Sequence, residues 1–145
     1  MAAEVVGPNG RVAGVDLVAV DPPLKLDNVL ATEGDLANSS AFPPLLDYLA
    51  GRADVLLCDA APKLTGVRAS DRAQEEALLV AVEAALAELL RPGGVALVKL
   101  LECPEAQAFE KRMRSRFEKC RVRKPKASRK GTTERYLYGH GYKGD

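Results

Sequence analysis

Tryptophan, histidine and cysteine are scarce in this sequence, which has no tryptophan, one histidine and three cysteines among 145 residues. The cysteines, Cys58, Cys103 and Cys120, lie far apart and show neither CxxC nor Cys/His spacing. This pattern argues against a disulfide framework and against a zinc site, so we expect no metal. The histidine, His140, lies in a glycine-flanked segment near the C-terminus, and we interpret it as a surface residue and not as a catalyst.

Long hydrophobic runs and familiar catalytic motifs are also missing. The longest apolar run, Val95 to Leu101, is interrupted by Lys99, and the N-terminus lacks the charged and apolar regions of a signal peptide. We therefore expect no membrane segment and no export. The cysteine usage favours a reducing compartment, so we predict a cytoplasmic protein, with a mitochondrion or another organelle as the alternative. The sequence contains no GxSxG, Walker or GxGxxG motif, which argues against the enzyme classes that depend on them.

The composition is that of a globular domain, and the positive and negative charges are unevenly distributed along the chain. Hydrophobic residues make up 47% of the chain, enough for one domain over residues 1–145, which we expect to be a monomer. Residues 1–110 contain 8 Lys and Arg against 17 Asp and Glu, whereas residues 111–145 contain 13 against 3. A basic segment, at about 111–135, is typical of a protein that binds nucleic acid, although a solvated basic surface is an equally good interpretation.

Segments with the pattern of strands alternate with segments with the pattern of helices. Strands are predicted at 11–16, 29–32, 55–58 and 95–101, helices at 42–49, 71–90 and 105–117, and closing strands around 122 and 136–142. This alternation predicts an α/β fold with a doubly wound sheet.

Charged residues lie at or near the ends of four predicted strands: Asp16, Asp35, Asp59 and Lys99. Ligands of open α/β sheets bind outside the carboxyl ends of the strands, so these side chains are candidates for a site. A single strand-terminal aspartate is more often a helix cap or a turn residue. Lys99 interrupts a buried strand, and beside Asp59 it is a candidate general base. A structural Lys–Asp pair, or a lysine that extends to the end of the sheet, explains these two residues equally well.

An ordered series of motifs resembles the FtsJ/RrmJ-type ribosomal-RNA 2′-O-ribose methyltransferases. The matching segments are residues 6–16 (VGPNGRVAGVD), 33–36 (EGDL), 54–62 (DVLLCDAAP) with Thr65, Gly66 and Asp71, 90–94 (LRPGG) with 97–99, and 122–129 with 134–136. Each segment alone is a weak signal, but their order and spacing together are specific. The resemblance covers the chain from about Gly7 to Tyr142.

The resemblance implies a Rossmann-like, S-adenosylmethionine-dependent methyltransferase sheet and assigns roles to several residues. Asp59, Lys99 and Glu134 match three members of the family's catalytic Lys-Asp-Lys-Glu tetrad. Asp16 would bind the ribose of S-adenosylmethionine and Asp35 its adenine, with Asp59 also at the cofactor. The expected RNA contacts are Arg121, Arg123, Lys124, Lys126, Arg129 and Lys130, and the expected partner is ribosomal RNA or the large ribosomal subunit.

Two parts of the family pattern have no match in this chain. The first lysine of the tetrad is absent, and so are the first strand and its glycine-rich loop, which bind the methionine end of the cofactor. We therefore expect a partial methyltransferase domain.

Three hypotheses follow. The chain is an RNA 2′-O-methyltransferase, acting on a uridine of large-subunit ribosomal RNA, or it is a catalytically inactive RNA-binding remnant. Alternatively, a misplaced start codon or a fragment conceals an ordinary member of the family.

Overall fold

The structure, a computed structural model, describes residues 2–124 and 134–144. In chain order the elements are α1 Ala2–Val6, β1 Val12–Asp16, β2 Val29–Glu33, the 3-10 helix η1 Ser39–Ala41, α2 Pro43–Leu49, β3 Ala53–Cys58, α3 Arg68–Leu89, β4 Leu90–Leu101, α4 Pro104–Arg116, β5 Phe117–Arg123 and β6 Glu134–Tyr142. None of the helices in the described part is both long and apolar enough to cross a membrane.

The strands form two sheets. β1 and β2 pair in parallel, whereas the second sheet has the order β3-β4-β6-β5. In that sheet β3 and β4 run parallel, and β6 runs antiparallel to both β4 and β5. The predicted α/β class is confirmed, but among the described residues no ladder of hydrogen bonds joins β1 to β3. One edge of each of these strands is therefore left without a strand partner.

Element boundaries differ from the prediction at the two ends of α3. The helix begins at Arg68, three residues before the predicted start, and β4 begins at Leu90, directly after the helix. The predicted strand begins only at Val95 because Pro92 and two glycines normally break regular structure. The strand passes through this point with Gly93 at a φ of 78°, a backbone conformation that favours glycine.

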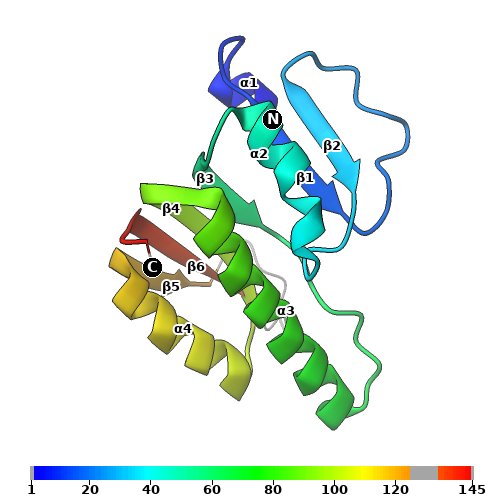
Figure 1. The fold of residues 1–145 in the computed structure, drawn as a ribbon. Coiled ribbons are helices and arrows are strands. Elements are labelled where there is room, and N and C mark those ends of the chain that lie inside the picture. The colour runs from blue at the N-terminus through cyan, green and yellow to red at the C-terminus, as the bar shows by residue number, and fades with distance from the viewer. Residues whose placement is uncertain (1, 125–133, 145) are drawn as a thin grey trace.

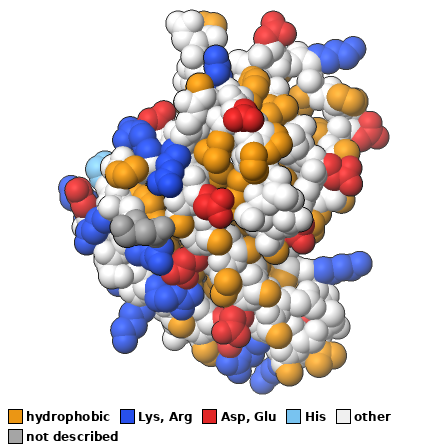
Figure 2. Space-filling model, viewed as in Figure 1, with side chains coloured by type: hydrophobic (Ala, Val, Ile, Leu, Met, Phe, Trp, Pro, Cys, Tyr) orange, Lys and Arg blue, Asp and Glu red, His pale blue; other side chains and the backbone are white. Residues whose placement is uncertain are grey.

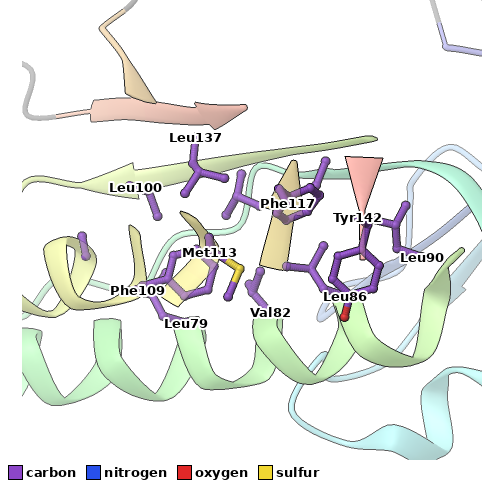
Figure 3. Packing of buried hydrophobic residues seen from close by; sticks show 13 residues of the cluster. Leu79, Val82, Leu86, Leu90, Leu100, Phe109, Met113, Phe117, Leu137 and Tyr142 are labelled. Atoms are coloured by element: carbon purple, nitrogen blue, oxygen red, sulfur yellow. The ribbon is translucent and has the colours of Figure 1, made fainter. Parts of the chain in front are cut away.

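Helices α2, α3 and α4 lie on one face of the strands (Figure 1). In the second half of β4 every second residue is buried, and Ala96, Val98 and Leu100 belong to the same cluster as the buried side chains of α3 and α4. Phe109 and Met113 of α4 fill the space between that helix and the sheet (Figure 3). A smaller cluster of buried side chains from α2 and α3 contacts both β1 and β3, so these helices connect the two sheets. These three helices all lie on the same face, whereas a doubly wound sheet carries helices on both faces.

Ion pairs tie α3 to α4 across the surface. The guanidinium of Arg72 binds Glu105 Oε1 through two nitrogens, at 2.8 and 2.6 Å, and Arg112 Nε lies 2.9 Å from Glu83 Oε2. Exposed pairs of this kind contribute little stability, so the buried clusters account for most of the attachment between the helices.

An aromatic ring covers a glycine in the middle of β6. A Cβ atom built on Gly139 would lie 2.8 Å from three atoms of the Phe117 ring, which is itself 1% exposed. The ring of Phe117 also packs against Tyr142, with 5.2 Å between the centroids. The absence of a side chain at Gly139 therefore lets β5 approach β6 with its aromatic residue inside the core.

We expect Gly139→Ala to destabilise the fold by about 1–3 kcal/mol, because the added methyl group overpacks the core. Gly14→Ala is the matched control, since a Cβ atom on Gly14 of β1 meets nothing within 4 Å. Urea denaturation of both variants measures the difference. Equal stability of the two variants would show that Phe117 moves aside without cost.

Candidate active site at the carboxyl end of the sheet

The predicted pair of Lys99 and Asp59 is present, and a tyrosine joins it. Lys99 Nζ lies 3.2 Å from Asp59 Oδ1, and the hydroxyl of Tyr136 donates to the same oxygen at 3.4 Å. The side chain of Lys99 is 12% exposed, whereas that of Asp59 is 79% exposed. Asp59 directly follows β3, and Lys99 lies opposite Tyr136 in the register of β4 and β6. Three segments distant in sequence thus place an ammonium, a carboxylate and a phenol together.

Glu134, the third predicted catalytic residue, lies at the same edge. It is the first residue of β6 and pairs with Leu101, so it is a diagonal neighbour of Lys99 in the sheet. Loss of water around Tyr136 raises the pKa of its phenol, and the carboxylates of Asp59 and Glu134 raise it further. Tyr136 therefore remains a hydrogen-bond donor at neutral pH.

The loop after Asp59 is fastened by one carboxylate. Asp71 accepts hydrogen bonds from the backbone and the hydroxyl of Thr65, at 2.6 and 2.7 Å, and from the nitrogen of Gly66 at 3.1 Å. The bonds from Thr65, first from its backbone, lower the pKa of Asp71. The first turn of α3 thereby holds the loop that borders the candidate site.

A buried carboxyl group supports the end of β4 from the side of α3. Glu75 is 4% exposed, and its Oε1 accepts from the nitrogen of Leu101 at 3.3 Å. Its Oε2 is buried with no hydrogen-bond partner among the described residues. Burial raises the pKa of Glu75, and the hydrogen bond from Leu101 opposes this effect. The charge of Glu75 at neutral pH is therefore costly to the folded state.

The two predicted cofactor acids lie at the carboxyl ends of the other sheet. Asp16 ends β1 and pairs in register with Glu33, and Asp35 follows two residues later. Asp16 Oδ1 accepts from the nitrogen of Val18, and Asp35 Oδ1 accepts from that of Ala37, so each carboxylate is oriented by its own turn. Both are exposed acceptors at the sheet end, which suits the hydroxyl and amino donors of an adenosine group.

The geometry can be compared with known proteins. The family model described as FtsJ-like methyltransferase matches residues 1–142. The chain belongs to this family. The recognition made from the motifs is thus confirmed.

Several relatives carry the name ribosomal RNA large subunit methyltransferase E. Those of Stutzerimonas stutzeri and Nitrosomonas europaea are 38% and 37% identical to this FtsJ-like chain, over 99% and 96% of it and 69% and 66% of their own lengths. That of Methanococcus aeolicus is 33% identical over 97% of this chain and 52% of its own length. The chain thus spans between about half and about two thirds of these relatives.

A solved structure supports the fold. A crystal structure from Plasmodium falciparum, assigned as a ribosomal RNA methyltransferase, superposes with a TM-score of 0.77 at 21% identity. The match covers 93% of this chain and 74% of that one. The predicted methyltransferase sheet is therefore confirmed as the architecture of this FtsJ-like chain.

The basic segment of the FtsJ-like chain divides into two surfaces. On α4, Arg112 and Arg116 pair with Glu83 of α3, and Arg114 pairs with Glu110 of α4 at 2.5 Å. These cations therefore form ion pairs within and between the helices. On β5, the predicted RNA contacts Arg121 and Arg123 are exposed, as is the predicted contact Lys124 just after the strand. Figure 2 shows basic side chains over the side of the molecule where α4 and β5 lie. Lys126, Arg129 and Lys130 lie outside the described residues.

The sequence alone did not predict the roles of two residues near the site, Tyr136 and Glu75. Tyr136 was noted only as part of a motif, and its bond to Asp59 depends on the register of β6 against β4. One feature of the sequence could have indicated the role of Glu75. It lies three residues before Leu78 and four before Leu79, on the apolar side of α3. A carboxylate on a buried stripe indicates a partner inside the fold.

We expect Glu75→Gln to raise the midpoint of thermal unfolding at pH 7. The folded-state pKa of Glu75 is raised above its ordinary value of 4.5, so this group costs stability as the pH rises above that value. Glutamine keeps an acceptor for Leu101 and carries no charge, so the advantage of the variant shrinks as the pH falls towards 4.5. Glu76→Gln, at an exposed position of the same helix, is the control. A Glu75→Gln protein that is less stable at pH 7 than at pH 4.5, relative to the parent, would contradict this.

Proposed function

We propose that this chain catalyses, or forms the main part of an enzyme that catalyses, S-adenosylmethionine-dependent 2′-O-methylation of ribosomal RNA in the cytoplasm. The observation that carries the proposal is the contact of Lys99 Nζ with Asp59 Oδ1 at the carboxyl end of the sheet, in a chain of the FtsJ-like family. The names of the relatives support ribosomal RNA as the substrate class, and a uridine of the large subunit is our candidate target. The inactive-remnant alternative loses support because the acid, the base and their tyrosine neighbour are assembled.

The chemistry requires a base because a ribose 2′-hydroxyl is a poor nucleophile. In its neutral amine form, Lys99 Nζ would accept the proton of the hydroxyl as the hydroxyl oxygen forms the new bond to carbon, and Asp59 would orient the amine. Glu134 would stabilise the ammonium that results, as a diagonal neighbour of Lys99. Tyr136 keeps Asp59 in place through its hydroxyl. S-adenosylmethionine, when bound, supplies a methyl group on a sulfonium and leaves as the neutral thioether.

The described residues fit one half of that cofactor. Asp16 and Asp35 present oriented carboxylates to the ribose and adenine donors, and Asp59 lies at the neighbouring strand end. No counterpart of the glycine-rich loop for the methionine end is present among the sequence motifs. By the family pattern, the strand that precedes such a loop would lie between β1 and β3, and the described residues show no ladder of hydrogen bonds between these two strands.

We expect residues 1–145 alone to bind S-adenosylmethionine weakly or not at all. A longer chain with a strand and a glycine-rich loop upstream of residue 1 should bind it stoichiometrically and unfold in one cooperative transition, because the added strand would pair with both open edges. Calorimetric titration and scanning calorimetry of both chains measure this. Tight binding by residues 1–145 would show that the assignment of the cofactor half-site is wrong.

In the chain that binds the cofactor, Lys99→Ala should lower methyl transfer by about 10²–10⁴-fold, the usual effect of removing a general base. Affinity for S-adenosylmethionine should stay within a few-fold, because the amine contacts the RNA hydroxyl. Transfer of tritium from labelled cofactor to ribosomal RNA measures the rate. Arg52→Ala, which removes an exposed cation before β3, is the control. A near-parental rate in the Lys99 variant would remove Lys99 from the mechanism.

A further inference from the structure

The end of β4 extends beyond its parallel neighbour. β3 ends at Cys58, which pairs with Val98, so residues 99–101 of β4 have no strand partner from β3 among the described residues. On the side of β6 the same residues remain paired, with residues 134–136. The part of β4 that carries the amine of Lys99 is therefore held by a ladder on one side only.

A carboxyl group from α3 binds the backbone at this point. Glu75 Oε1 accepts a hydrogen bond from the nitrogen of Leu101 at 3.3 Å, and Glu75 is 4% exposed. Both the carboxylate and the neutral acid can accept through this oxygen, so the contact does not depend on the charge of Glu75. The bond ties the end of β4 to α3 where β3 no longer accompanies the strand.

The same side of α3 also holds the loop that follows Asp59. Asp71, which accepts hydrogen bonds from that loop, lies four residues before Glu75, so the two carboxyl groups are neighbours on one face of the helix. Asp59 and Lys99 thus approach each other from two segments, and each segment is fastened to neighbouring turns of α3.

We propose that Glu75 is a positioning residue for Lys99, which holds the end of β4 so that the amine stays against Asp59. The inference rests on the proposed function, in which this pair takes part in methyl transfer. Lys99 Nζ lies 3.2 Å from Asp59 Oδ1. A shift of the strand end by about 1 Å would carry the two atoms to the limit of an ion pair, about 4 Å, and misplacement of that size lowers a rate by up to about 10²-fold.

Apolar packing alone does not fix this part of the strand. Leu100 is 3% exposed and lies in one buried cluster with Leu79 of α3 (Figure 3). Apolar contacts are non-directional, so they hold β4 against the helix without defining how far the strand lies along it. A hydrogen bond is directional, and the one to Leu101 acts two residues after Lys99.

The cost of burying Glu75 supports a role beyond stability. Its Oε2 is buried without a hydrogen-bond partner among the described residues. An unsatisfied buried oxygen destabilises a fold, and proteins tolerate such local costs preferentially at functional sites. The candidate active site is the functional site that Glu75 adjoins, through the end of β4.

The first test measures the accessibility of Lys99 without substrate or cofactor, by labelling residues 1–145 with isotope-coded acetic anhydride and mass spectrometry. Glu75→Leu fills a similar volume but removes the acceptor, so Lys99, whose side chain is 12% exposed in the parent, should be acetylated several-fold faster. Glu75→Gln keeps an acceptor and should show the parental rate. Exposed Lys111 of α4 is the internal standard.

A matched control separates positioning from a general loss of stability. Leu86→Ala opens a cavity at a fully buried position of the same helix, and it should leave the labelling of Lys99 unchanged. Thermal unfolding verifies that each variant is folded. Glu75→Ala also lacks the acceptor, and it takes the place of Glu75→Leu if that protein does not fold.

The second test is kinetic. In the chain that binds the cofactor, Glu75→Leu should lower kcat by about 10–10²-fold and leave the KM for ribosomal RNA within a few-fold, because the position of Lys99 matters in the chemical step and not in RNA binding. Glu75→Gln should restore kcat. A merely structural role would give Leu86→Ala the same loss as Glu75→Leu.

Parental labelling of Lys99 in Glu75→Leu, or equally fast labelling in Glu75→Gln and Glu75→Leu, would overturn the inference. Faster labelling in Leu86→Ala as well would also overturn it, because stability would then explain the effect. Methyl transfer by the parent is assayed separately. Its absence would refute the proposed function, and the labelling would still decide whether Glu75 positions Lys99.

Discussion

The alternation of side chains along β4 is the constraint on which both the core and the candidate active site depend. Ala96, Val98 and Leu100 point to α3 and α4 and are buried. The residue between the last two, Lys99, therefore points to the other face, where it meets Asp59. A shift of one residue in register would exchange these faces, placing an ammonium in the core and leucine in the site. The stability of the core thus enforces the position of the amine.

Much of this arrangement could be predicted from local patterns. Asp59 and Lys99 were paired correctly because neighbouring parallel strands end at the same edge, and a break in an apolar run marks the strand end. The contact of Tyr136 depends on how β6 returns antiparallel to β4, which no local pattern specifies. Glu75 was not recognised because its neighbours fit a helical stripe, and only the fold shows that its carboxyl group meets a backbone nitrogen of β4.

The basic segment illustrates the limit of composition as a guide. The excess of positive charge after residue 110 fits a surface for nucleic acid and a solvated basic surface equally well. In the fold, the helical part of the segment lies on α4, where Glu83 and Glu110 pair with three of its arginines, whereas the described part on β5 carries exposed cations. The difference arises because the chain turns from α4 into β5 at Phe117, so residues close in sequence reach opposite sides of the sheet. The charge pattern therefore identifies the basic segment, and the chain topology determines which of its cations remain exposed on the surface.

The position of β6 after all the other strands affects how the protein folds during its synthesis. Asp59 and Lys99 are translated well before Tyr136, and Leu137, which packs against Leu100 in the buried cluster, follows Tyr136 directly. A nascent chain that has released β3, α3 and β4 from the ribosome already carries the acid and the base, but β4 then lacks its antiparallel neighbour. Synthesis of the last strand thus completes the core and the site in one event. A prematurely terminated product would lack Leu137 and Tyr142 of the core and Tyr136 of the site, and it would expose the edge of β4 that β6 covers.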